Sequence, residues 1–68
     1  MVRFRLHLVA AERETFRIKQ IAEKAGLERN TVAGIFHNRA KMVALETIDR
    51  LCKALGCAAG DLLEYVPD

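Results

Sequence analysis

The sequence contains few of the residues that mark linkers, disulfide scaffolds and membrane anchors. It has one proline, two cysteines and no tryptophan among 68 residues, and no apolar run approaches the roughly 18 residues that span a bilayer. We therefore expect no linker, no disulfide framework, no membrane segment and no signal peptide. This length predicts a single domain over residues 1–68, and we expect it to be cytoplasmic.

Groups suited to catalysis or metal binding are also missing from the sequence. Cys52 and Cys57 do not have the spacing of a zinc site, and the two histidines lie elsewhere in the chain. Neither a Ser/His/Asp set nor a pair of carboxylates stands out as a catalytic arrangement. We therefore expect no enzyme, no metal and no cofactor, and we interpret both cysteines as small buried hydrophobic residues.

Lysine and arginine are concentrated in the first part of the chain. Residues 1–41 carry nine Lys/Arg and four Asp/Glu, a net charge of +5, whereas residues 42–68 carry two and five, a net charge of −3. Because basic side chains displace counterions from phosphates, a basic half favours a polyanionic partner such as nucleic acid.

Hydrophobic periodicity predicts a short strand followed by five short helices. Apolar residues alternate from Val2 to Leu8, which predicts a strand over 2–5 that runs into a helix ending near Arg13. Since a lone strand is unstable, we expect it to pair with the C-terminal segment 63–66 or with the same strand of a second copy. Further helices are predicted at 18–25, 28–37, 45–55 and 59–63.

The apolar positions of these helices predict the core. We expect Phe16 to plug the entry to the second helix, and Gly26 to end that helix in a left-handed conformation. The side chains expected to face the core are Leu6, Val9, Ala10, Ile18, Ile21, Ala22, Ala25, Leu27, Val32, Ile35, Phe36, Leu45, Ile48, Leu51, Cys52 and Leu55. The helix starts lack Ser, Thr, Asp or Asn caps, apart from a partial role for Asp61 in the last helix, so packing or a partner must compensate.

The outer face of the third predicted helix carries an unusual set of residues. Ala33 and Gly34 lie there, although glycine in a helix costs roughly 1 kcal/mol relative to alanine. Such small residues indicate close approach, either of another part of the protein or of a DNA groove. Arg29 and Asn30 precede them, and these side chains can bond guanine and adenine in the major groove. Thr31 and the first-turn N–H groups suit a phosphate.

The segment 17–38 resembles the DNA-binding helix-turn-helix. This motif has a small residue where its helices meet, then a glycine, an apolar residue and two buried positions, and the matching residues are Ala22, Gly26, Leu27, Val32 and Ile35. Within the motif, IKQIAEKAGLERNTV also looks like the lactose-repressor family. The downstream LETIDRLCKALGCAAGDLLEY is similar to the last two helices of the Cro/CI (XRE) family. Motif and tail together resemble a small single-domain member of that family.

The resemblance implies an all-α fold, namely a compact five-helix lambda-repressor-like DNA-binding domain whose recognition helix is 28–37. The implied base-contacting residues are Arg29, Asn30, Ala33 and Gly34. The implied phosphate-contacting residues are Arg17, Lys19, Thr31, His37, Asn38, Arg39 and Lys41. The chain departs from the family pattern at Ile18, where glutamine is common, and at Glu28, where serine or threonine is common, so both positions lack the usual polar contact.

These features predict a sequence-specific transcriptional regulator that binds double-stranded DNA, acting as a repressor that occupies an operator. Since one domain of this size covers little DNA, we expect a homodimer. The alternative is a protein-interaction module with the same fold, such as the antitoxin of a toxin–antitoxin pair, with a small protein partner. We expect no membrane contact and no small-molecule ligand, because 68 residues leave no room for a sensor domain.

Overall fold

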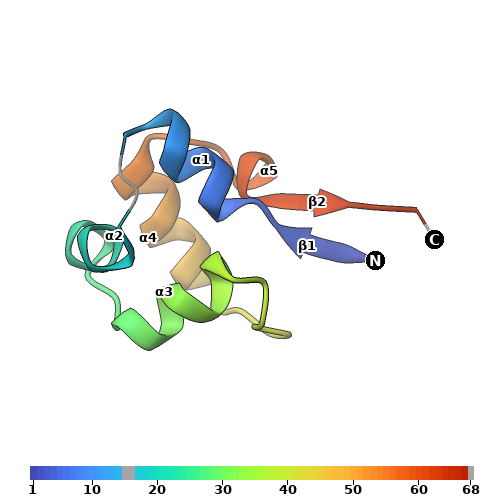
Figure 1. Cartoon of the computed structure of the whole chain (residues 1–68), viewed down its shortest axis with the longest axis horizontal. Helices are drawn as coiled ribbons and strands as arrows, with labels where there is room; N and C mark the ends of the chain where they lie inside the picture. Colours follow the sequence, from blue (N-terminus) through green and yellow to red (C-terminus); the bar gives the residue numbers. More distant parts are fainter. Residues whose placement is uncertain (15–16, 68) are drawn as a thin grey trace.

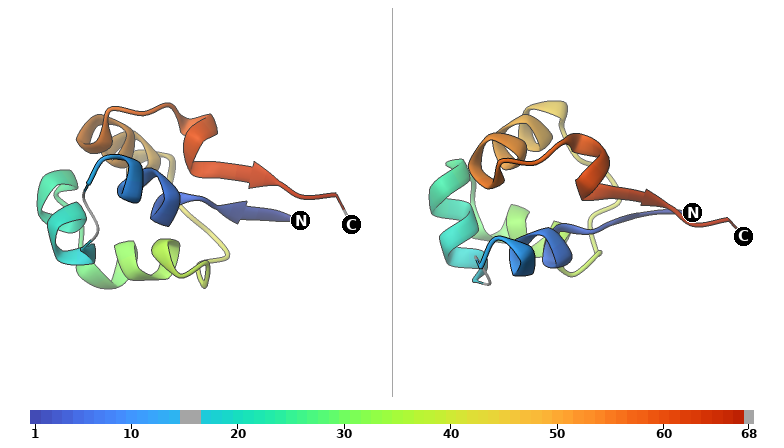
Figure 2. Two further views of the ribbon diagram at one scale, coloured as in Figure 1. Left: turned by 45° about the horizontal axis from the view of Figure 1, so that its top comes forward. Right: turned by 90° about the horizontal axis from the view of Figure 1, so that it is seen from above.

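The computed structural model describes residues 1–14 and 17–67. In these residues the elements follow the order β1 (Val2–Phe4), α1 (Leu6–Glu12), α2 (Ile18–Ala25), α3 (Arg29–Phe36), α4 (Leu45–Leu55), α5 (Ala59–Leu62) and β2 (Leu63–Tyr65). The helices gather around one core, and the two strands project from it as a ribbon (Figure 1 and Figure 2). The prediction of a five-helix fold with a short N-terminal strand is confirmed for the described residues.

The ribbon pairs the first strand with the last one. β1 and β2 are antiparallel, and Arg3 lies opposite Glu64, with its Nε 3.0 Å from a carboxylate oxygen of that residue. Met1 and Val66 extend the pairing, because each backbone nitrogen donates to the carbonyl oxygen of the other, at 2.6 and 2.7 Å. The predicted strand therefore finds its partner within the chain. It stops one residue early because the Arg5 backbone already turns into α1.

The core receives side chains from every helix and from β1. The buried hydrophobic residues are Phe4, Leu6, Val9, Ala10, Ile21, Ala22, Ala25, Val32, Ile35, Ile48, Leu51, Leu55 and Leu62. Each fully buried Leu, Ile or Val side chain contributes about 1.5–3 kcal/mol relative to an exposed one. α4 packs against both α2 and α5, so it joins the helical pair α2–α3 to the C-terminal part of the core.

The prediction that Leu45 faces the core is wrong, because its side chain is 88% exposed. Leu45 is the first residue of α4, and side chains in a helix lean toward its N-terminus. A residue at this position therefore projects past the end of the packed helix, and the buried face of α4 begins one turn later at Ile48. Ile18, the first residue of α2, is half-buried for the same reason. The prediction for Phe16 lies outside the described residues.

The helix α2 ends in a left-handed glycine, as the sequence predicts, and α4 ends in the same way. Gly26 and Gly56 have φ values of 67° and 63°. In each case the N–H of the next residue bonds a carbonyl oxygen in the last turn, at 2.9 Å after α2 and 3.1 Å after α4, which is the Schellman arrangement. This arrangement turns Leu27 and Cys57 back toward the core, where both are half-buried.

The helix starts are uncapped, as predicted. Among the described residues, no side-chain hydrogen bond caps the first turn of α1, α2, α3 or α4. In α5 the Asp61 carboxylate accepts the Ala58 N–H at 2.9 Å, which confirms the partial cap. The stability of the first four helices therefore depends on packing.

Both cysteines are half-buried free thiols packed against the core. Burial, and then the neighbouring Cys52, raise the pKa of the Cys57 thiol above its usual value. A raised pKa leaves less thiolate at neutral pH, so Cys57 is a weak nucleophile. The geometry agrees with a packing role for this pair, although neither residue is fully buried.

Candidate nucleic-acid interface

α2 and α3 form a helical pair around the turn at Gly26. Ala22 is only 3% exposed, so a larger side chain there would press into the neighbouring helices. Arg50 of α4 holds the turn from the other side, because its guanidinium lies 3.3 Å from the Gly26 carbonyl oxygen and 3.0 Å from the Glu46 carboxylate. A Cβ at Gly26 would lie 3.1 Å from the same guanidinium. The positive φ therefore favours glycine at the turn, and a Cβ there would also require the guanidinium to shift by a few tenths of an ångström.

The predicted recognition helix 28–37 corresponds to α3, with Glu28 and His37 as its capping residues. Val32 and Ile35 are buried and hold the helix on the core. At the N-terminal end, Arg29, Asn30 and Thr31 are exposed. The structure thus brings the two predicted base-reading side chains together on the free first turn of α3.

Gly34 lies where the chain folds back over α3, and it is half-buried rather than exposed. Its carbonyl oxygen accepts the N–H groups of Arg39 and Ala40, at 2.8 and 3.0 Å. A Cβ at Gly34 would lie 3.6 Å from the Ala40 Cβ, an ordinary van der Waals distance. Ala33 is also half-buried. The loop therefore packs closely on α3 at Gly34, but an alanine would also fit there, so the loop alone does not require glycine.

Basic side chains lie exposed on both sides of the helical pair. Arg17 and Lys19 are at the start of α2, and Arg39 and Lys41 are in the loop after α3. His37 is exposed at the end of α3, with its ring 5.4 Å from that of Phe36 in an edge-on arrangement. The predicted phosphate contacts at these positions are therefore all accessible to a polyanion.

Asn38 is the predicted site residue whose surroundings the sequence did not reveal. It has a positive φ of 59°. Its side-chain Oδ1 accepts the Phe4 N–H at 2.6 Å, and its Nδ2 donates to the Phe4 carbonyl oxygen at 2.9 Å. Phosphate contact by Asn38 stays a prediction, but its amide is already bonded to β1. No periodic pattern signals this pair, because the two residues are 34 positions apart.

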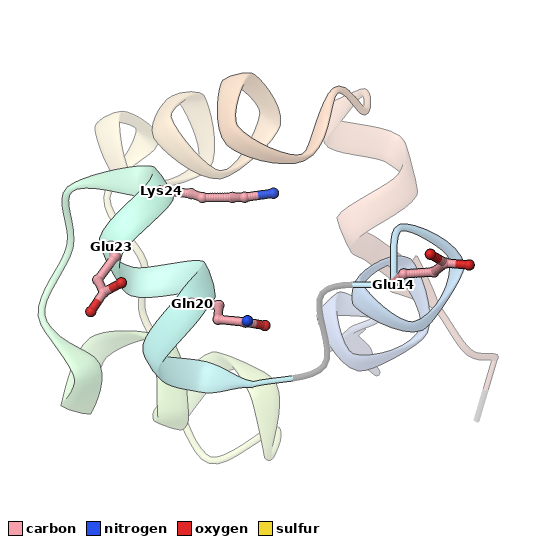
Figure 3. A pocket seen from close by; sticks show the side chains of 4 residues that line it. All are labelled: Glu14, Gln20, Glu23 and Lys24. Atoms are coloured by element: carbon pink, nitrogen blue, oxygen red, sulfur yellow. The ribbon is translucent and has the colours of Figure 1, made fainter.

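A surface hollow of about 210 Å³ lies between α2 and the turn after α1. Gln20 and Lys24 extend from α2 toward Glu14 on the other side (Figure 3). The hollow is open and its polar groups are of mixed charge, so it does not resemble a pocket that selects one ligand. Within residues 1–14 and 17–67, no group of three or more His, Cys, Asp or Glu side chains could hold a metal ion.

In the part of the chain that the structure describes, no helix is both long and apolar enough to cross a membrane.

Comparison with known proteins places these elements in a family. The chain is 33% identical over 51 residues to YozG of Bacillus subtilis (strain 168), which is described as an uncharacterized HTH-type transcriptional regulator. The match covers 75% of this chain and 61% of that relative. No solved structure matches significantly. Residues 5–68 match the Cro/C1-type HTH DNA-binding domain, and the chain belongs to this family.

Proposed function

We propose that the protein binds specific sequences in double-stranded DNA and represses transcription in the cytoplasm by occupying an operator. One observation carries this proposal. The first turn of α3 is exposed and bears Arg29 and Asn30, while basic side chains flank it on α2 and on the loop after α3. Membership of a DNA-binding family supports the same reading.

The proposed base contacts come from the exposed end of α3. Arg29 can bond the O6 and N7 acceptors of guanine, and Asn30 can pair with the N6 and N7 groups of adenine. Ala33 and Gly34 follow one turn later, and their small size allows the helix axis to approach the groove. Thus the first turn reads the bases and the second turn sets the depth of the helix.

The uncapped starts of α2 and α3 favour the proposed phosphate contacts. The first N–H groups of α2 and α3 have no side-chain cap, and such groups together with the helix dipole favour a phosphate. Around them the proposed contacts are Arg17, Lys19, Thr31, His37, Arg39 and Lys41. Glu28 at the start of α3 carries the opposite charge, so we expect closer backbone contact at α2.

A homodimer is part of the proposal. A single module buries about 600–1,000 Å² on DNA, and a two-fold dimer places two recognition helices about 34 Å apart. Exposed apolar side chains offer surface for such a contact: Val2 and Tyr65 on the ribbon are 64% and 69% exposed. A dimer should select a palindromic site.

Selection of bound duplexes from a random-sequence pool tests the proposal. The expected result is an enriched motif with two inverted half-sites and an affinity that falls steeply with salt concentration. Enrichment of a single half-site would remove the homodimer. Failure of the full chain to bind any duplex at low salt would overturn the function itself.

The second candidate function is an antitoxin or a related module that binds a small protein. Met42, in the loop before α4, and Leu45, the first residue of α4, are 91% and 88% exposed. Exposed apolar residues together with uncapped helices suit a chain that a partner stabilises. A small protein that co-purifies in a fixed ratio, encoded in an adjacent reading frame, would favour this candidate. It also predicts that Leu45→Ser abolishes that association while duplex binding is unchanged.

A further inference from the structure

Asn38 follows α3 in a conformation that few side chains adopt. Among the described residues, it shares a positive φ with one other non-glycine residue, Glu14. Asparagine is among the residues that tolerate this conformation. Its own N–H bonds the Ile35 carbonyl oxygen at 3.1 Å, so the backbone closes the last turn of the recognition helix. The side chain is thus free to reach across to β1.

The Asn38 amide bonds the edge of β1 that β2 does not cover, in the manner of a neighbouring strand. Met1 and Val66 exchange two backbone hydrogen bonds, and the Arg5 N–H bonds the Leu62 carbonyl oxygen at 2.7 Å. In an antiparallel pair the bonded positions alternate, so the N–H and C=O groups of Phe4 point away from β2. The Asn38 side chain supplies both missing partners, at 2.6 and 2.9 Å.

The same residue determines where the basic loop begins. Directly after it, the N–H groups of Arg39 and Ala40 both bond the Gly34 carbonyl oxygen. The residues directly after Asn38 are thereby bonded to α3 through Gly34. Asn38 itself is bonded to β1 through its side-chain amide. Both amide bonds are partly buried, which reduces competition from water.

We propose that Asn38 is a positioning residue of the DNA-binding surface rather than a DNA ligand. By joining the end of α3 to β1, it sets the orientation of the loop from which Arg39 and Lys41 reach the phosphates. This role rests on the proposed DNA-binding function, and it assigns to the ribbon a part in DNA recognition through the bonds between Phe4 and Asn38.

The first test is Asn38→Gly, which removes both amide bonds, keeps the charge and adopts the positive φ without strain. The probe is the duplex enriched from the random pool. We expect its affinity to fall by at least about fivefold, since each of the two bonds that fix the loop is worth about that factor. Glu14→Gly is the matched control, since it introduces glycine at the other positive φ; its affinity should not fall.

The second test removes the other side of the contact. A chain of 68 residues is accessible to chemical synthesis, so the Arg3–Phe4 peptide bond can be replaced by an ester that lacks the Phe4 N–H. We expect a loss of about fivefold from the ester, which removes one of the two bonds, and no loss beyond that of Asn38→Gly when the two changes are combined. The Met1–Val2 ester is the control, because it weakens a ribbon carbonyl that accepts the Val66 N–H and leaves Asn38 bonded.

The outcomes separate three explanations. If Asn38→Gly weakens binding and the Arg3–Phe4 ester does not, Asn38 contacts DNA directly and the positioning role is overturned. If both esters weaken binding only in proportion to the unfolded fraction, measured by denaturation of each variant, the contact is merely structural and the proposal fails. If the native chain binds no duplex, the proposed function fails before any variant is compared.

Discussion

The two ends of α3, the proposed recognition helix, differ in how many contacts hold them to the rest of the protein. At the N-terminal end of α3, no side chain caps the first turn and Arg29, Asn30 and Thr31 are exposed. At the C-terminal end, Gly34 receives two backbone hydrogen bonds and Asn38 is bonded to β1. The difference separates two tasks along eight residues. One end leaves its first-turn N–H groups without a side-chain cap, as the proposed DNA contact requires, while the other end is bonded to the rest of the fold.

The largest effect is expected from the fixed end. Ile35→Ala removes a side chain that is 2% exposed, and we expect the free energy of unfolding to fall by about 2–5 kcal/mol. The total free energy of unfolding of a native protein is only about 5–15 kcal/mol, so a fraction of the variant molecules should be unfolded. Urea denaturation followed by circular dichroism measures the loss. Thr31→Ala at the open end is the control, and an equal loss there would remove the distinction between the ends.

The next effect concerns the open end alone. Arg29→Ala should relax base preference at one position, by about 1–3 kcal/mol of discrimination. Because Arg29 is exposed, the free energy of unfolding should stay within about 0.5 kcal/mol of the native value. Repeating the duplex selection with the variant measures the first quantity. Arg39→Ala should instead weaken all duplexes alike; an unchanged motif with Arg29→Ala would show that this side chain reads no base.

A smaller effect tests whether the uncapped first turn of α2 also contacts DNA phosphates. Lys19 lies in its uncapped first turn, and Lys19→Ala should reduce the slope of log affinity against log salt by about 0.9, the value for one phosphate. Lys53→Ala is the matched control, because Lys53 lies on α4 and is bonded to Asp49 at 3.2 Å. Equal slopes for the two variants would place the start of α2 away from the DNA backbone.

The smallest effect tests whether the loop after α3 or a DNA groove requires glycine at position 34. Alanine fits there at an ordinary contact distance from Ala40, and it favours a helix over glycine by about 0.5–1 kcal/mol. We therefore expect Gly34→Ala to raise the free energy of unfolding. If the second turn of α3 also approaches a groove, the same variant should bind the selected duplex less tightly. A more stable variant with native affinity would show that neither the loop nor a DNA groove requires glycine at this position.

Periodicity predicted the helices well because it records which face of each helix is buried. The bounds of α4 were predicted at 45–55 and found at Leu45–Leu55. The same pattern wrongly placed Leu45 in the core, because periodicity does not reveal where the packing partner of a helix ends. Alternation likewise predicted β1 without identifying its partner, since the period is the same for pairing within or between chains.

The candidate site was predicted where it depends on local spacing. The exposed positions of Arg29 and Asn30 follow from the buried positions of Val32 and Ile35 on the same helix. The contact of Asn38 with Phe4 does not follow from spacing, because it joins a side chain to the backbone of a distant strand. Such contacts depend on the tertiary arrangement, and single-sequence patterns carry no record of them.

The contact between Arg50 and the turn at Gly26 has a consequence for how the family can vary. A Cβ at position 26 would lie 3.1 Å from the guanidinium, so the arginine would have to shift by a few tenths of an ångström to admit one. A change at this glycine therefore strains the backbone at its positive φ and disturbs the bond from Arg50 to the Gly26 carbonyl oxygen. Among relatives in which asparagine replaces the glycine, we expect the residue opposite the turn on α4 to vary more than it does where the glycine is kept.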